Sequence, residues 1–525
     1  MSGETVTAAA VETQDRRRWL ALAVIVAAQF MVVLDVAIVN VALPSIQIDL
    51  GFSPENLQWV ITAYSICFGG VLLLGGRLAD LLGRRRMFMA GVVLFTIASL
   101  LNGFSWSEGS LIGFWSLQGL GAALVSPAAL SILTTTFQEG RDRNRALGIW
   151  GAVAGSGGAA GVLLGGVLTS GFSWPWIFFV NVPVGALVVA VSPWLLRESR
   201  ADLDNRNFDV AGATAITAGL MVLVYALTRA TEHGWGTPTT VGLLTASGLL
   251  IASFFLIELR SKAPLLPLRI LRLRTLAASN MSGLIAGGAI FAQFFLLTLY
   301  MQQVLHYSAL KTGVAYIALT LTTIAFSAVT QALVTRIGVR KVLPAGLALS
   351  AVALVLFAQL PVHGHYFPDL FPAFIISGLG LAFAFVTMAI GALTGVRDTD
   401  AGIASGLINT SQQIGGAIGV AIATTIATTF TNRYVDSHPG TTPFSGAALT
   451  HGFEVAFYVL AAITVVGALV AALMLESQPS SAEPAPQSDA YCAGAGVREM
   501  TTASSSAGSV SSPTQSNRPD PRIAH

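Results

Sequence analysis

The feature that most limits the fold of this chain is a succession of fourteen long apolar stretches. A helix needs about 20 mostly apolar residues to cross a bilayer. Of the 525 residues, 54% are hydrophobic and only 10% are charged, whereas soluble domains carry about 25% charged residues. The sequence therefore predicts an all-α membrane protein with fourteen transmembrane helices, which begin near Trp19, Leu57, Met87, Leu111, Leu147, Ile177, Val210, Val241, Leu276, Thr312, Val342, Phe371, Ile403 and Phe453.

The distribution of positive charge predicts the orientation of these helices. If the N-terminus is cytoplasmic, the inner loops and tails receive all but three of the 28 Lys and Arg residues, the exceptions being Arg229, Lys311 and Arg433. Loops rich in Lys and Arg stay on the cytoplasmic side of a membrane. We therefore expect a multi-pass protein with both termini in the cytoplasm. The first stretch lacks a cleavage site and is expected to be retained as a helix.

The two halves of the chain carry similar glycine motifs in the same order. Gly83 is echoed by Gly338, Gly119 by Gly378 and Gly157 by Gly415, at separations of 255, 259 and 258 residues. Internal repeats of this kind are typical of transporters with a binding site between two bundles. The expected organisation is a cytoplasmic N-terminus (1–18), an N-terminal six-helix bundle (19–200), two inserted helices (201–262), a C-terminal six-helix bundle (263–476) and a disordered cytoplasmic tail (477–525).

Several motifs resemble the major facilitator superfamily, and in particular its fourteen-helix drug:proton antiporter branch. The resemblance covers roughly Trp19 to Glu476. It implies a major facilitator fold and proton-coupled export of drugs or antibiotics by alternating access. The motifs are the loop signature Gly76–Arg86, the first-helix signature Leu34–Pro44, and the segments Trp176–Gly185, Phe208–Gly212 and Leu299–Val304.

Asp35 is the strongest single candidate for a functional residue. It is flanked by Met31–Leu34 and Val36–Val39 and so lies within an apolar helix. An acid at this depth costs roughly 2.5–3.5 kcal/mol on insertion scales, and acids inside membrane spans are usually functional. Because loss of water favours the neutral acid, we expect Asp35 to exchange protons and to couple them to transport. The alternative is a structural acid held by hydrogen bonds.

The loop signature predicts a gate at the cytoplasmic side. Gly76 and Gly83 permit tight reversal and close helix approach, and Asp80 can pair with a nearby arginine or face a helix start. Arg84 and Arg85 lie where anionic lipid headgroups are found. By resemblance these five residues form a gating loop, while the alternative is a charged loop that only sets orientation.

Two positions depart from the family pattern. Trp115 stands three residues before Gln118-Gly119, where the pattern has an arginine linked to proton transfer, and Val162 stands where the pattern has a proline linked to export. Gly157, Gly161 and Gly165 remain, four residues apart, as a helix-packing stripe. Because proline is what bends a helix, we expect the fifth span to be straighter than in the family.

A substrate cavity is the least determined part of the sequence. Its candidates are aromatic or polar residues near glycine-rich helix faces: Tyr64, Trp115, Gln118, Asn409 and Gln413. Packing or lipid contact is the alternative for the aromatic residues. Helix–helix hydrogen bonding is the alternative for Asn409 and Gln413, which are four residues apart.

Other function classes find little support in the sequence. None of the three lysines follows a glycine, so there is no phosphate-binding loop of an ATP-driven pump. No catalytic motif, cofactor, metal site or nucleic-acid partner is expected, and the expected partners are a lipophilic or cationic small molecule, protons and membrane lipids. The chain is expected to act as a monomer in a bacterial cytoplasmic membrane. The open alternatives are a permease for a nutrient or siderophore, an uncoupled facilitator and, less favoured, a membrane enzyme or sensor.

Overall fold

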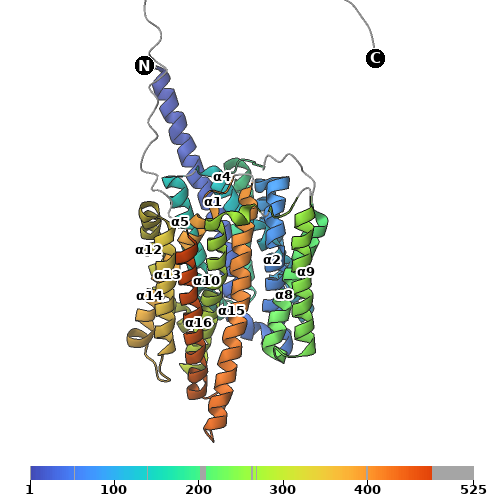
Figure 1. Ribbon diagram of the computed structural model, residues 1–525, viewed down its shortest axis with the longest axis vertical. Helices are drawn as coiled ribbons and strands as arrows, with labels where there is room; N and C mark the ends of the chain where they lie inside the picture. The colour runs from blue at the N-terminus through green and yellow to red at the C-terminus, as the bar shows by residue number, and fades with distance from the viewer. Residues whose placement is uncertain are drawn as a thin grey trace, which may run out of the picture. The chain divides into compact units, whose positions relative to one another are not determined.

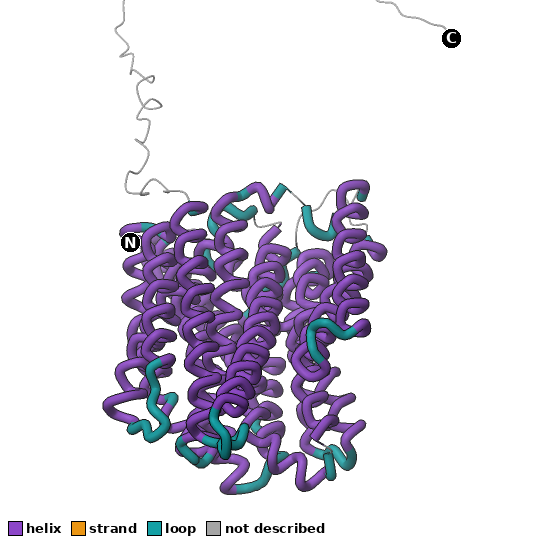
Figure 2. Tube along the Cα trace, turned by 60° about the horizontal axis from the view of Figure 1, so that its bottom comes forward, coloured by secondary structure: helices purple, strands orange, loops and turns teal. Residues whose placement is uncertain are grey.

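The computed structural model describes residues 2–52, 54–138, 140–200, 209–261, 264–267, 269–397 and 400–475. The regular elements within these ranges are helices, joined by short turns and loops (Figure 2). The expected tail, 477–525, lies outside the described residues. The expected all-α fold class is confirmed.

Seven helices make up the N-terminal half. They are α1 (Ser2–Leu50), α2 (Pro54–Leu82), α3 (Arg84–Gly103), α4 (Glu108–Thr136), α5 (Arg141–Gly171), the short α6 (Trp176–Phe179) and α7 (Asn181–Leu195). Most extensively, α2 and α3 pack against α4, and α1 packs against α5. The α6–α7 pair forms a single span, Trp176–Leu195.

Two further helices precede the C-terminal half. They are α8 (Val210–His233) and α9 (Pro238–Arg260), which pack against each other. The C-terminal half contains η1 (Ile270–Arg272), α10 (Arg274–Leu299), η2 (Tyr300–Val304), α11 (Ala309–Ala315), α12 (Ile317–Ile337), α13 (Val339–Ala358), η3 (Tyr366–Leu370), α14 (Phe371–Leu393), α15 (Ala401–Ser437) and α16 (Gly446–Met474).

The number of spans agrees with the sequence. Thirteen helices of the described chain are long and apolar enough to cross a membrane, and α5 becomes the fourteenth when its two segments are counted as one span. Those segments, Arg141–Gly158 and Ala160–Gly171, are bent by 42°. The fifth span is therefore bent although Val162 stands where the family pattern has a proline, and whether it is straighter than in the family stays a prediction. The bend follows Ser156, Gly157 and Gly158, and Gly/Ser pairs are a common cause of kinks without proline.

The halves meet mainly through four helices. In the N-terminal half α2 and α5 face the C-terminal half, where α15 packs against α2 and α12 packs against α5. The inserted helix α8 contacts both α2 and α15, and it lies beside α2 in Figure 1. The inserted pair therefore borders the junction instead of forming part of either six-helix half.

The internal repeat appears in matching helix contacts. A β-carbon added at Gly121 of α4 would lie 2.7 Å from the backbone nitrogen of Phe95 in α3. One added at Gly380 of α14 would lie 2.8 Å from the backbone nitrogen of Ser350 in α13. Both pairs are related by the repeat separations of 255 and 259 residues. The α3–α4 and α13–α14 pairs thus have the same close backbone packing.

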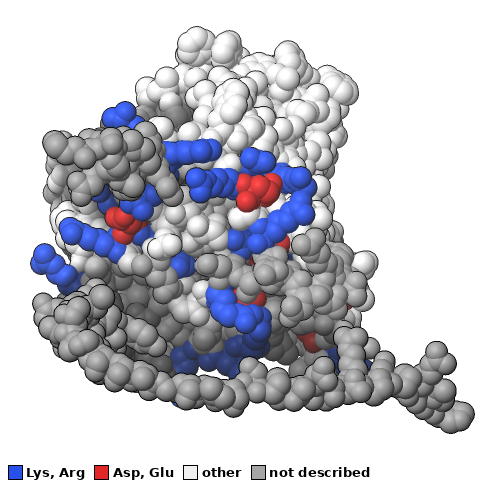
Figure 3. Space-filling view, turned by 90° about the horizontal axis from the view of Figure 1, so that it is seen from above, with Lys and Arg blue, Asp and Glu red and all other residues white. Residues whose placement is uncertain are grey.

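Positive charge gathers at one end of the helices. Figure 3 views this end, where Lys and Arg side chains are numerous around a few acids. Helices start or finish there with basic residues, as in Arg84–Arg86 of α3 and Arg274 of α10. This is the end that the charge pattern assigns to the cytoplasm.

Candidate functional site

Asp35 lies at the centre of a buried polar network in the N-terminal half. It falls within the span Arg16–Leu43 of α1 and has 0% exposed surface. The side-chain amide of Gln118, on α4, donates a hydrogen bond of 2.7 Å to Oδ2 of Asp35. The amide of Asn181, at the start of α7, donates one of 2.6 Å to Oδ1. Both carboxyl oxygens are therefore held by neutral donors.

The network continues into α3 by two routes. Asn102 Nδ2 donates to Gln118 Oε1 over 2.7 Å, and Asn181 Nδ2 also donates to the hydroxyl of Ser99 over 3.1 Å. Ser99 in turn donates to the backbone carbonyl of Phe178 over 2.9 Å. Buried polar groups that are linked in this way fix the relative positions of the helices that carry them.

Two aromatic residues cover this network. The rings of Tyr64, on α2, and Trp115, on α4, are 4.7 Å apart between centroids, and Trp115 meets Phe178 edge-on at 5.4 Å. Both side chains are 2% exposed, and neither the hydroxyl of Tyr64 nor the indole N–H of Trp115 has a hydrogen-bond partner among the described residues. Trp115 thus fills, with an uncharged ring, the position at which the family pattern has an arginine.

Ser99, Asn102 and Asn181 were missed by the sequence analysis. Asn181 belongs to a segment that was used only for the family resemblance, and Ser99 and Asn102 are isolated polar residues in an apolar span. Their spacing of three residues on one helix face was the available signal.

The glycine stripe of α5 packs against the helix that carries Asp35. A β-carbon at Gly157 would lie 2.7 Å from the side chain of Val33, and one at Gly161 would lie 2.6 Å from the carbonyl oxygen of Leu34. At Gly165 it would lie 2.9 Å from the carbonyl oxygen of Ile38. The stripe lets the backbones of α1 and α5 touch on the side of α1 next to Asp35.

A second group of candidates lies at the basic end of the helices, between α2 and α15. Asp80 accepts hydrogen bonds from Arg84 Nε at 3.1 Å and from Nη2 at 2.9 Å, and both side chains are at most 2% exposed. The other carboxyl oxygen of Asp80 faces Gly402, in the first turn of α15. Helix starts carry unpaired N–H groups and a partial positive charge, which stabilise an acid there.

Close backbone contact supports this arrangement. A β-carbon at Gly402 would lie 2.6 Å from the carbonyl oxygen of Gly76, and one at Gly76 would overlap the carbonyl of Gly402. Gly83 has φ 115, which a residue with a side chain rarely adopts, and starts α3 beside the carboxylate of Glu198. Glu198 also accepts a hydrogen bond of 3.2 Å from the backbone N–H of Arg85. Gly76, Asp80 and Arg84 therefore lie at the contact of α2 with α15, and Gly83 and Arg85 lie beside Glu198 at the turn into α3.

The remaining candidates lie on α15. Ser126, on α4, donates a hydrogen bond of 3.2 Å to the side-chain oxygen of Asn409, whose amide donates to the carbonyl of Ser405. Gln413, one turn later, is partly buried. These two residues are near the contact of the halves, whereas Tyr64, Trp115 and Gln118 surround Asp35 within the N-terminal half. The five candidates thus form two separate groups.

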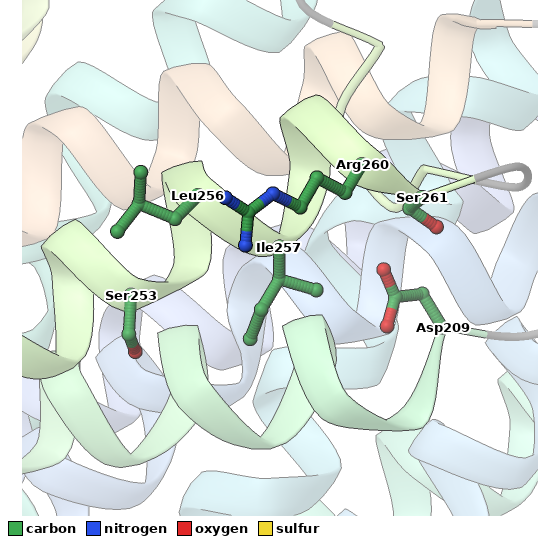
Figure 4. A pocket seen from close by; sticks show the side chains of 6 residues that line it. All are labelled: Asp209, Ser253, Leu256, Ile257, Arg260 and Ser261. Atoms are coloured by element: carbon green, nitrogen blue, oxygen red, sulfur yellow. The ribbon is translucent and has the colours of Figure 1, made fainter.

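A surface pocket of about 470 Å³ lies elsewhere, between the start of α8 and the end of α9 (Figure 4). It contains none of the predicted site residues. Within the described ranges, no group of three His, Cys, Asp or Glu side chains is placed to hold a metal ion. The pocket is lined by Asp209, Ser253, Leu256, Ile257, Arg260 and Ser261.

Comparison with known families agrees with this geometry. The family model of the Major Facilitator Superfamily matches residues 25–420, with a second match over residues 280–516. The chain belongs to the major facilitator superfamily. It is therefore a multi-pass membrane transporter and not an enzyme, as the loop and first-helix motifs predicted.

Several characterised major facilitator proteins are similar along most of their length. The puromycin resistance protein of Streptomyces alboniger is 39% identical over 487 residues, which cover 92% of this chain and 96% of that protein. The cephamycin export protein of Amycolatopsis lactamdurans is 40% identical over 402 residues, covering 76% and 82%. The tetracenomycin C resistance and export protein of Streptomyces glaucescens is 34% identical over 403 residues, covering 77% and 74%.

A solved major facilitator structure supports the fold alone. The human organic anion transporter TETRAN aligns with a TM-score of 0.59 and 15% sequence identity, over 87% of this chain and 99% of that one. The predicted fold, with two six-helix bundles and two inserted helices, is thus confirmed. The residue boundaries predicted for these domains remain a prediction.

Proposed function

We propose that this transporter is a proton-coupled antiporter that exports amphipathic drugs or antibiotics across the cytoplasmic membrane of a bacterium. The observation that carries the proposal is Asp35, a fully buried carboxyl group in a membrane span whose hydrogen-bond partners in the described chain are two neutral amides. An acid without a fixed counter-charge can change its protonation state during transport. The names of the similar resistance and export proteins support the drug class.

Asp35 couples the two fluxes by competition. It takes up a proton when its surroundings open to the outside and releases it when they open to the cytoplasm. Drug binding favours the charged form of Asp35, and protonation favours drug release. The proton and the drug therefore each shift the population of the state that binds the other, as thermodynamic linkage requires. Inward proton flow then drives outward drug flow.

Asp80 acts as the cytoplasmic latch. Its ion pair with Arg84 is buried, and its second oxygen faces the start of α15 in the other half. When the halves separate at this end, the carboxyl group of Asp80 loses its contact with the start of α15, and water enters between the halves. A contact that exists only in the closed arrangement favours that arrangement, and Gly76, Gly83 and Arg85 support it.

The substrate meets both groups of cavity candidates. Tyr64, Trp115 and Gln118 offer aromatic and amide surface next to Asp35, and Asn409 and Gln413 offer amides on α15. In this proposal the chain works as a monomer surrounded by membrane lipids, with both termini in the cytoplasm.

The proposal is tested with purified protein in liposomes under an imposed pH gradient, using ethidium because its charge does not titrate. We expect ethidium to accumulate in vesicles with an acidic lumen, beyond protein-free liposomes, and to be released when nigericin collapses the gradient. Movement that ignores the gradient would identify an uncoupled facilitator, and drug movement in the same direction as protons would identify an uptake permease.

A further inference from the structure

The two amides that hold Asp35 differ in how firmly they are fixed. The carbonyl oxygen of Gln118 accepts a hydrogen bond of 2.7 Å from Asn102, so its amide nitrogen has to point toward Asp35. Asn181 is 2% exposed and uses its amide nitrogen for both Asp35 and Ser99, while no side chain of the described residues donates a hydrogen bond to its carbonyl oxygen. Gln118 is thus paired with another amide, whereas Asn181 is paired with a hydroxyl group, which can both donate and accept.

This difference matters because a carboxyl group needs different partners in its two states. The carboxylate accepts only, whereas the acid has one O–H that must find an acceptor. Gln118 can supply that acceptor only if Asn102 turns as well, because otherwise the two amide NH2 groups would face each other. Asn181 can supply it, because a carboxamide turned by half a turn occupies nearly the same space.

Ser99 permits this turn. Its hydroxyl now accepts from Asn181 and donates to the carbonyl of Phe178 over 2.9 Å. If the oxygen of Asn181 moved to face Asp35 and Ser99, the hydroxyl could rotate and donate to that oxygen. No covalent bond changes, and the single proton stays on Asp35.

From these contacts we propose that Asn181 is a positioning residue for proton coupling, which donates to charged Asp35 and turns to accept from the protonated acid. The inference rests on the proposed proton coupling at Asp35. It assigns α7 as the helix that senses the proton, since Asn181 starts α7 and Ser99 links it to α3. The titratable group that faces Asp35 is Tyr64, on α2, and its hydroxyl has no partner. No Lys, Arg or His side chain of the described residues forms an ion pair or hydrogen bond with Asp35.

The experiment reads the protonation of Asp35 directly, without transport. Infrared difference spectra of the full chain in lipid bilayers are recorded as a function of pH, and the carboxylic acid band that is absent from Asp35→Asn is assigned to Asp35. Removal of Asn181 takes away a donor that favours the charged form more than the neutral one. We expect Asn181→Ala to raise the midpoint of this band by about one pH unit, because a hydrogen bond to a charged group exceeds a neutral one by about that amount.

Two further variants keep the outcome clear. Asn181→Leu preserves the approximate volume without donors and should shift the midpoint in the same direction if the alanine variant does not fold. Asn280→Ala is the matched control, because Asn280 is a buried asparagine of α10 that bonds Ser411 and the carbonyl of Leu276, away from Asp35. It should leave the midpoint unchanged.

The results separate this inference from the proposed function. A shift in both Asn181 variants but not in Asn280→Ala supports the positioning role, even if the liposome assay shows that drug flux is uncoupled. Equal midpoints in wild type and in both Asn181 variants would overturn the role of Asn181, while coupled ethidium transport would still support the function of Asp35. A wild type with no titrating band assigned to Asp35 would overturn this inference too.

Discussion

The two halves of the transporter join their first and fourth helices in the same way but with different chemistry. In the N-terminal half Gln118, on α4, donates to Asp35, on α1, over 2.7 Å. In the C-terminal half Gln293, on α10, donates to Ser377, on α14, also over 2.7 Å. Gln118 and Ser377 are equivalent in the repeat, because each precedes one of the paired glycines Gly119 and Gly378. The acid is present only in the first half.

The same contrast appears at the contacts between the halves near the basic end of the helices. Asp80, on α2, faces Gly402, on α15. The positions that the repeat separations of 255 and 258 residues relate to these are Thr335, on α12, and Asn144, on α5. Asn144 donates a neutral hydrogen bond of 3.2 Å to Thr335. The halves therefore share a packing scheme, and at these two pairs of equivalent positions the acids, Asp35 and Asp80, lie in the N-terminal half.

Substitution of Asp35 should have the largest effect on transport and should remove the difference between the two halves. In Asp35→Asn the shape is retained and the titration is lost, so we expect uphill ethidium accumulation to fall to that of protein-free liposomes. Gln293→Ala removes the neutral pair of the other half and should retain uphill transport. The measurement is the pH-gradient assay in liposomes, and uphill transport by Asp35→Asn would remove Asp35 from the coupling mechanism.

Removal of the charge of Asp80 should have the second-largest effect. Asp80→Asn removes the charge that faces the start of α15 in the other half, a contact that contributes up to about 2 kcal/mol when it is buried, so the halves should separate more often at this end. Spin labels at Arg86 and Arg397, whose side chains are 65% and 60% exposed, should move apart in electron–electron distance measurements. Thr335→Val should leave the distance distribution unchanged. An unchanged distribution in Asp80→Asn would mean that this contact does not hold the gate.

Packing should respond equally in both halves. A β-carbon at Gly161 would lie 2.6 Å from the carbonyl oxygen of Leu34, and one at Gly419 would overlap the backbone of Gly288. Overpacking of this kind destabilises by about 1–3 kcal/mol, so both alanine variants should lower the melting temperature. Gly113→Ala is the control, because nothing lies within 4 Å of its added carbon. A loss in only one half would show that close packing is not shared.

The smallest effect should come from the amides. A hydrogen bond to a charged group contributes about 1.5–3 kcal/mol, part of which is lost equally by the protonated form, so Gln118→Ala should raise the pH of half-maximal ethidium transport by about one unit. Gln293→Ala should not move it. The pH profile of initial rates checks both, and equal shifts in the two variants would contradict the assignment of the titrating group to the N-terminal half.

Much of the fold could be predicted from the sequence, because apolar length and positive loops determine spans directly. The buried position of Asp35 could also be predicted, because an acid with apolar neighbours on both sides is easily recognised in a sequence. Its partners were not, because Gln118, Asn181 and Ser99 come from three helices, and only tertiary packing brings them together. Similarly, Asp80 was predicted from its loop, but its neighbour Gly402 lies more than 300 residues away in the chain.

Two local expectations show where sequence reasoning is weakest. The absence of proline at Val162 suggested a straighter helix than in the family, yet α5 bends by 42° near its glycines, because Gly/Ser pairs also allow a helix to bend. Trp115 was grouped with cavity residues, and it is 2% exposed between Tyr64 and Phe178. Burial of a large side chain depends on neighbours that the sequence does not reveal.

The most direct test of the central claim, that Asp35 exchanges a proton for the drug, is proton release on drug binding. Purified wild type and Asp35→Asn are each mixed with ethidium in weakly buffered detergent solution containing a pH-sensitive dye. The account predicts that wild type releases protons on binding and that Asp35→Asn releases none, although it binds ethidium. Equal proton release by the two proteins would show that another group carries the proton.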